Sequence, residues 1–230
     1  MPEASFPTTR WSLILASHAD PARAREALSR LLADYWQPLY VSLRRRGLAR
    51  AEAEDAVQSF AVHLLQTATL ARLDPARGRL RAYLKTALSH HVSHQREREL
   101  AQKRGAGQVV ALDADAAEAL LAQSPESPDA AFDRAWARRT FDRALTRLAE
   151  EHRREARAGP FEVIAAYFQQ GGELSYAEAA RQHGLSVPQL KSLLHRARAR
   201  FRAVLAEEVA ETVAAPDEVE QELADLLRCL

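Results

Sequence analysis

The sequence LSYAEAARQHGLSVPQLKSLLHRARARFRAVL, residues 174–205, decides the fold prediction. Two patterns of the capping-box type mark helix starts in this stretch: Ser175 with Glu178, and Ser186 with Gln189. Gly184 lies between them and suits the left-handed backbone conformation that ends a helix. Pro188 falls in the first turn of the second helix, where its missing N–H is tolerated. The stretch therefore predicts a short helix, a glycine turn and a longer helix, which is the order of a helix-turn-helix.

The second helix of this stretch has an apolar face and a basic face. The apolar positions recur at helical spacing: Leu190, Leu193, Leu194, Ala197, Phe201, Val204 and Leu205. The basic face is made of Lys191, His195, Arg198 and Arg202, with Ser192, Arg196 and Arg200 beside them. No acidic residue occurs between Ala179 and Ala206. A solvated basic face on an ordinary bundle helix is one interpretation. Together with the two caps and the glycine turn, however, the basic row favours DNA binding.

This stretch resembles region 4 of the bacterial sigma-70 family, of the small extracytoplasmic-function (ECF) type. The resemblance rests on the LSY-E-A helix, the G-S turn and the K-S-L-HRAR-R helix. It implies that the second helix lies in the major groove of the minus-thirty-five promoter element. The residues that it implies for DNA contact are Ser186, Gln189, Lys191, Ser192, His195, Arg196, Arg198 and Arg200. The preceding HRREARAGPFEVIAAYF segment, residues 152–168, resembles an ECF-like variant group with an extended region 4 and a C-terminal tail.

Residues 51–66 have the spacing of a helix whose first turn is acidic, where carboxylates complement the helix dipole. The EDAVQSFAVHLL sequence within it resembles sigma region 2.2, which docks on the clamp helices of the polymerase β′ subunit. The resemblance implies polymerase contacts at Asp55, Gln58 and Ser59. Ser59 departs from the family pattern, because an acidic residue usually follows the glutamine there.

The sequence RGRLRAYLKTALSHHV, residues 77–92, predicts a helix with an apolar stripe and a basic outer surface. Such a surface can follow a phosphate backbone and hold unstacked bases. The sequence resembles sigma regions 2.3 and 2.4, which open and recognise the minus-ten element. The candidate contacts are Arg81, Lys85, Ser89, His90, Ser93 and Arg96. Tyr83 falls on the apolar stripe, so we expect it to pack in the core.

Nearly all periodic segments have helical spacing, so we expect an all-α protein with two small helical domains. The predicted boundaries are a region 2-like domain at 1–104, an acidic linker at 105–130 and a region 4-like domain at 131–215. An acidic amphipathic tail is expected at 216–230. Pro38 predicts a kink or break in the helix that begins near Pro21. For the tail, we expect packing against its own domain, shielding of the basic recognition helix, or docking of a regulator.

Composition and motifs narrow the functional classes. The net charge is only +1, but basic and acidic blocks alternate along the chain. A single cysteine, and no predicted leader or membrane-spanning segment, favour a cytoplasmic location without membrane association. His90 and His94 have a spacing that can bind zinc, but no nearby cysteine or carboxylate completes a site on that face. No phosphate-binding loop or nucleophile motif occurs, so we expect neither an enzyme, a cofactor nor a metal site.

The resulting functional prediction is a sigma factor that directs core RNA polymerase to promoters, helps to melt them and initiates transcription. The resemblance implies the β′ clamp helices and β flap of core polymerase as partners, together with promoter DNA. An anti-sigma factor or another regulator remains open as a further partner. Two alternatives stand beside this prediction. One is a sigma-like DNA-binding regulator that does not initiate transcription, and the more remote one is a metal-dependent enzyme built on the histidines.

Overall fold

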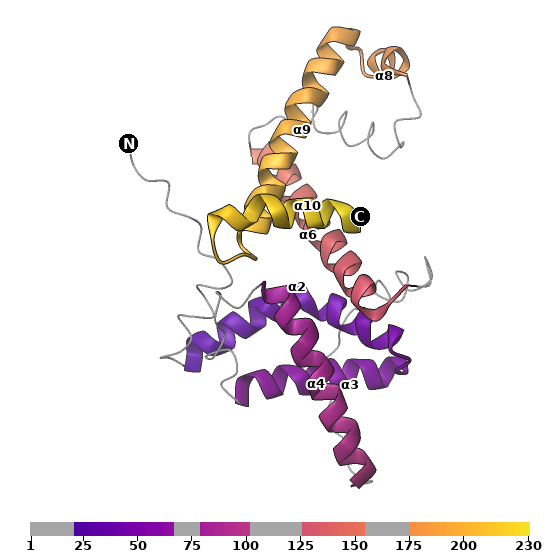
Figure 1. Cartoon of the computed structure of the whole chain (residues 1–230). Helices are drawn as coiled ribbons and strands as arrows, with labels where there is room; N and C mark the ends of the chain where they lie inside the picture. Colours follow the sequence, from indigo (N-terminus) through magenta and orange to yellow (C-terminus); the bar gives the residue numbers. More distant parts are fainter. Residues whose placement is uncertain (1–20, 67–78, 102–125, 155–174) are drawn as a thin grey trace. The chain divides into compact units, whose positions relative to one another are not determined.

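The computed structural model describes residues 21–66, 79–101, 126–154 and 175–230, and these residues form helices without any strand (Figure 1). The α-helices are α2 (Pro21–Arg45), α3 (Arg50–Gln66), α4 (Leu80–Ala101), α6 (Pro128–Arg154), α8 (Tyr176–Gln182), α9 (Val187–Ala210) and α10 (Val219–Cys229). A short 3-10 helix, η4 (Pro216–Glu218), precedes α10. The predicted all-α class is confirmed for these residues. The helices expected at 8–18, 114–122 and 161–169 lie outside them. Within the described parts, no helix combines the length and apolar character needed to span a bilayer.

The chain divides into two compact units. The first unit contains Met1–Arg139 and Val209–Leu230, and the second contains Thr140–Glu208. These boundaries differ from the predicted domains at 1–104 and 131–215, because the start of α6 and the whole C-terminal tail belong to the first unit. Most of the expected linker, 105–130, lies outside the described residues.

The first unit buries apolar residues from α2, α3, α4, α6, α10 and the end of α9. Its largest fully buried side chains are Tyr35, Tyr40, Phe60, Phe132, Leu31, Leu39, Leu43, Leu64, Leu80, Leu84 and Leu88. The rings of Tyr35 in α2 and Phe132 in α6 stack with centroids 6.3 Å apart. From α10, Leu223 and Leu226 are also buried. The tail is therefore part of this unit and not a separate appendage.

Helix α2 continues through Pro38 from Pro21 to Arg45, so of the predicted kink or break, the break does not occur. Proline removes one intrahelical hydrogen bond and usually interrupts a helix. Here Pro38 is itself buried, and its neighbours Leu39 and Tyr40 are fully buried in the core. Tertiary packing outweighs the local preference, because breaking the helix would expose these side chains. The helix is followed by a glycine in the left-handed region, Gly47, with φ 88°.

The helix-turn-helix geometry of residues 175–210 agrees with the prediction in its local details. Both capping boxes form: the Ser175 hydroxyl accepts from the backbone N–H of Glu178, and the Ser186 hydroxyl from that of Gln189. In return, the Glu178 and Gln189 side chains accept from the backbone N–H of the capping serines at 3.0 and 2.8 Å. Gly184 has φ 65°, and the next backbone N–H, of Leu185, donates to the Ala180 carbonyl at 2.8 Å. This turn brings the two helices together over their buried residues.

Gly184 offers a test of the turn that isolates backbone strain. A Cβ at this position would meet no atom within 4 Å, so a substitution affects only the positive φ. We expect Gly184→Ala to lower the free energy of unfolding by about 1 kcal/mol, since an alanine is strained in the left-handed region. Gly184→Asn is the matched control, because asparagine tolerates this conformation better. Urea unfolding followed by circular dichroism measures both, and equal losses would contradict a conformational role for Gly184.

Candidate nucleic-acid interface

In the second unit, the packing of α8 against α9 fixes which side of α9 faces outward. Ala179 and Ala180 of α8 form a buried cluster with three residues of α9, namely Leu190, Leu194 and Ala197. Tyr176, Leu185, Val187 and Leu193 close this cluster at its edge. Because these apolar positions share one side of α9, the polar residues between them are directed outward.

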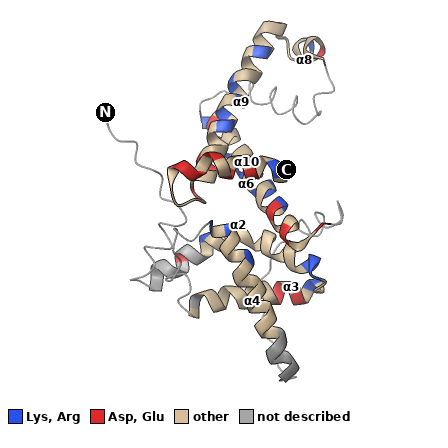
Figure 2. Cartoon of the chain, viewed as in Figure 1, with Lys and Arg blue, Asp and Glu red and all other residues tan. Residues whose placement is uncertain are grey.

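The outward side of α9 is basic. The exposed residues that the sequence predicted for DNA contact there are Lys191, Ser192, His195, Arg196 and Arg198. Figure 2 shows the Lys and Arg positions along this helix. The Lys191 ammonium lies 5.3 Å from the centre of the Tyr176 ring, which connects α9 to α8 by a cation–π contact. A capped helix with an exposed row of cations can contact phosphates along a groove.

Three other predicted residues of this helix already have partners within the protein. Ser186 and Gln189 are exposed, but their side chains make the capping box that begins α9. Arg200 donates to Glu151 of α6 at 2.6 and 2.9 Å and to Glu207 at 3.0 Å. The hydrogen bond from Arg200 lowers the pKa of Glu151, and the same contacts raise that of Arg200. Arg200 thus joins α9 to α6 in an ion-pair cluster.

In the first unit, the predicted contacts on α4 have varied surroundings. His90 and Ser93 are exposed. Ser89 is half-buried and accepts a hydrogen bond from Arg46 at 3.0 Å. Lys85 donates to Asp133 of α6 at 2.9 Å, and its ammonium also lies 5.8 Å from the centre of the Phe132 ring. The backbone of Arg96 belongs to α4, but its side chain lies outside the described residues. Tyr83 is half-buried, and burial raises its pKa.

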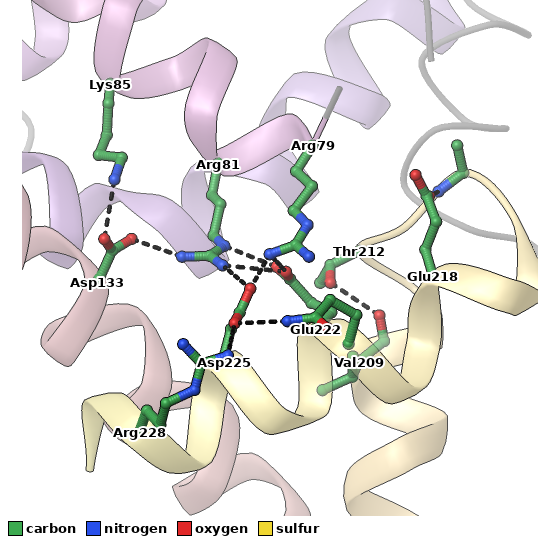
Figure 3. Close-up of polar contacts among 12 residues, drawn as sticks. Arg79, Arg81, Lys85, Asp133, Val209, Thr212, Glu218, Glu222, Asp225 and Arg228 are labelled. Atoms are coloured by element: carbon green, nitrogen blue, oxygen red, sulfur yellow. Dashed lines mark hydrogen bonds and ion pairs between the residues drawn. The ribbon is translucent and has the colours of Figure 1, made fainter. Parts of the chain in front are cut away.

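Arg81 lies at the centre of an ion-pair cluster that joins α4 to α6 and α10 (Figure 3). Its side chain is only 11% exposed, and its guanidinium lies 4.8 Å from the centre of the Trp136 ring. It donates to Glu222 at 2.7 and 3.1 Å, to Asp133 at 2.9 Å and to Asp225 at 3.1 Å. Burial by itself would lower the pKa of Arg81, but the hydrogen bonds and charges of Glu222 and Asp133 outweigh it and raise the pKa.

The tail contributes two carboxylates to this cluster, and their partners precede or begin α4. Glu222 has a side chain that is 2% exposed and pairs with Arg79 at 2.7 Å as well as with Arg81. Asp225 also binds both arginines. Sequence reasoning did not identify Arg79, Asp133, Glu222 or Asp225. The spacing of Glu222 and Asp225, three residues apart on one helix, was a visible signal, but it does not specify which cations they meet.

The predicted polymerase contacts lie on α3. Asp55 is exposed, whereas Gln58 and Ser59 are half-buried. The Ser59 hydroxyl lies 2.9 Å from Nε2 of His91 and 3.3 Å from Oε1 of Gln95, so it joins α3 to α4. The departure of Ser59 from the family pattern thus coincides with a contact inside this unit.

The histidines of α3 and α4 surround a hollow of about 890 Å³ between the two helices. His63, His90, His91 and His94 line it, together with Ser59, Tyr83 and Gln95. The His63 and His91 rings lie 5.1 Å apart, and Phe60 packs against His91 at 5.6 Å. Among the described residues, no group of three or more His, Cys, Asp or Glu side chains has a geometry that could hold a metal ion.

Comparison with known proteins finds no match: no family model fits the chain, and no curated protein or solved structure is similar to it. Functional inference therefore rests on the residues and their geometry. Two features carry it, the exposed basic side of α9 and the arginine cluster at the start of α4. On that side of α9 the cations are exposed, whereas at the start of α4 they form ion pairs with carboxylates of the same unit.

Leu226 and Leu227 provide a matched test of the docking of α10. Leu226 is 0% exposed and Leu227 is 55% exposed, although they are adjacent. We expect Leu226→Ala to lower the free energy of unfolding by about 2–4 kcal/mol, because it leaves a cavity in the core. Leu227→Ala should change it by less than about 0.5 kcal/mol. Urea unfolding of the two variants checks this, and a Leu226→Ala variant as stable as Leu227→Ala would show that α10 is not docked.

The arginine cluster also predicts a pH dependence. Burial alone would raise the pKa of Asp225, but the hydrogen bond and charge of Arg79 lower it below its usual range. Because its folded-state pKa is lowered, ionised Asp225 stabilises the fold at pH values above the ordinary aspartate pKa of about 4. This contribution is lost as the pH falls through the folded-state pKa. We therefore expect the full chain to lose more stability below about pH 4 than the Asp225→Asn variant does. Urea midpoints across this range measure the difference, and parallel curves would rule out the contribution.

Proposed function

We propose that this chain is a sigma-like transcription factor that binds promoter DNA through α9 and directs core RNA polymerase to initiate there. The observation that carries the DNA-binding part is the exposed basic side of α9. A glycine turn with φ 65° and a capping box position this helix, and buried residues on its other side leave Lys191, Arg196 and Arg198 outward. Local positive charge, rather than the net charge of +1, supplies the attraction to phosphate.

The polymerase part of the proposal rests on the resemblance of residues 54–65 to sigma region 2.2. The exposed position of Asp55 on α3 supports it, because a docking carboxylate must be accessible to a partner. The proposed partners are the β′ clamp helices and β flap of core polymerase, with promoter DNA as the nucleic acid. The proposed site of action is the cytoplasm, where these partners occur.

A DNA-binding regulator that does not initiate transcription is the second candidate. Two observations favour it over an initiation factor. Ser59 contacts His91 of the same unit, and Arg81 and Lys85 of α4 are paired with carboxylates. In this function α9 would bind DNA as proposed, while the first unit would not recruit polymerase or hold a melted strand.

The DNA-binding part is tested with paired charge variants. Lys191→Ala/Arg196→Ala removes two exposed cations from α9, and Arg153→Ala/Arg154→Ala removes two exposed cations from the end of α6. We expect the α9 variant to bind duplex DNA at least roughly tenfold more weakly, with the salt slope reduced by roughly 1 to 2. Fluorescence anisotropy with a pool of randomised duplexes measures this. If the two variants lose equal affinity, α9 is not the DNA-binding element.

Transcription by core RNA polymerase separates the two candidates. DNA selected from the randomised pool by the full-length chain serves as template, with core polymerase alone as the reference. An initiation factor should form a complex with core polymerase and produce transcripts with a defined start. Asp55→Ala should weaken that complex, and Leu227→Ala is the control for an exposed change elsewhere in the same unit. Selective DNA binding without a polymerase complex or defined start would establish the regulator instead.

A further inference from the structure

The cations at the start of α4 are paired with carboxylates of the same unit, most of which come from the tail. Arg79 directly precedes this helix, and Arg81 and Lys85 lie in its first two turns (Figure 3). The carboxylates that meet them come from two other helices, Asp133 from α6 and the pair Glu222 and Asp225 from α10. The two arginines take most of their negative partners from α10, because both bind Glu222 and both bind Asp225.

The geometry at Glu222 is of the kind that arginine uses for phosphate. Arg81 donates through Nε to one carboxylate oxygen at 2.7 Å and through Nη2 to the other at 3.1 Å. This two-pronged contact matches a planar guanidinium to two oxygens of one anion, which phosphate groups also offer. Arg79 adds a third contact, to Glu222 Oε2 at 2.7 Å. The Glu222 carboxylate therefore occupies the position that a phosphate oxygen pair would take between the arginines.

Its short length and its dependence on ion pairs make α10 a helix that can be displaced. The helix has 11 residues, a length at which an isolated helix is marginal in water. Its attachment depends on the buried residues Leu223 and Leu226 and on the carboxylates at the arginines. At its C-terminal end Leu227 and the following Leu230 are exposed, so the apolar stripe of α10 is only partly covered. A polyanion that takes the arginines away from Glu222 and Asp225 would thus remove much of what fixes α10.

We propose that α10 is a built-in competitor for a phosphate-bearing polyanion at the Arg79–Arg81 surface, so that nucleic acid binds there only when α10 leaves. That the polyanion is a nucleic-acid backbone rests on the proposed function. The tail then lowers the affinity of the first unit for DNA until polymerase or promoter DNA displaces it. The predicted shielding of basic residues is retained in this proposal, but the shielded residues precede and begin α4.

The test compares two full-length variants with equal charge changes. Glu222→Gln/Asp225→Asn neutralises the two carboxylates at the arginines and keeps side chains of the same size. Asp217→Asn/Glu220→Gln neutralises two exposed carboxylates of the same tail. Each variant loses two negative charges, so its net charge rises by the same amount. A general electrostatic effect on DNA binding is therefore the same in both. Asp225→Asn alone is a milder variant that leaves the buried Glu222 in place, and circular dichroism checks that all variants retain their helices.

Affinity for a fluorescent forked duplex is the first measurement. We expect Glu222→Gln/Asp225→Asn to bind at least roughly tenfold more tightly than the matched control, with the salt slope steeper by roughly 1.4 to 1.8 for two additional phosphate contacts. The affinity of Asp225→Asn should lie between those of the two double variants. Adding Arg79→Gln to the double variant should remove about half of the gain in slope. Equal affinities of the double variant and its control would overturn the proposal.

Cys229 provides a second measurement that does not depend on a promoter. It is the only cysteine, it lies at the end of α10, and its partial burial raises the pKa of its thiol. Release of α10 should therefore increase its rate of reaction with a disulfide reagent by roughly tenfold. We expect this increase in Glu222→Gln/Asp225→Asn, and in the unmodified chain when DNA or heparin is added.

The two measurements separate this proposal from the proposed function. If heparin increases the Cys229 rate but the chain neither binds DNA nor supports transcription, the displaceable tail stands and the proposed function fails. If the chain binds DNA and initiates transcription, yet saturating DNA and heparin leave the Cys229 rate unchanged, the competition is refuted and the proposed function stands. An increase by both polyanions, with tighter binding by the double variant, supports both.

Discussion

Pairing between arginines and carboxylates of different helices is the constraint on which the rest of this structure depends. In the first unit, Glu222 is almost completely buried, and a buried carboxylate is tolerated only when charged partners replace its water. Arg79 and Arg81 supply that charge, and in doing so fix where α10 lies against α4. The second unit has the same arrangement, since Glu208 is paired with Arg143 and Arg147 of α6. In both units, carboxylates of the described C-terminal helices thus meet arginines from elsewhere in the same unit.

This pairing determines which cations can attract a nucleic acid. A guanidinium that is ion-paired with two or three carboxylates contributes little to the electrostatic potential outside the protein. An exposed guanidinium contributes its full charge within about one Debye length. Arg81 and Arg200 belong to the first class, although both lie in rows that the sequence marks as basic. Lys191 and Arg196 are exposed on α9. The net charge of +1 accordingly includes, within the described residues, internally compensated clusters and the outward basic side of α9.

Local signals predicted the helices well and their partners poorly. The predicted helix at 51–66 corresponds to α3 (Arg50–Gln66), and both capping boxes and the left-handed Gly184 are present. These features depend on residues within a few positions of one another. Of the kink or break expected at Pro38, the break is wrong, because burial of Leu39 and Tyr40 keeps α2 continuous. Six of the residues predicted for DNA contact on α9 are exposed, but Arg200 is paired with Glu151, which is distant in sequence.

The sequence by itself determined the all-helical class, the positions of the described helices and the apolar and basic sides of α9. Periodicity and capping are short-range properties, so they can be recognised without knowing the fold. Only the tertiary structure decided that the tail joins the first unit and that its carboxylates meet Arg79 and Arg81. Those partners are more than a hundred residues apart, and charge alone did not distinguish one basic helix from another. The burial of Leu223 and Leu226 and the pairing of Glu222 and Asp225 with these arginines together decide where α10 lies.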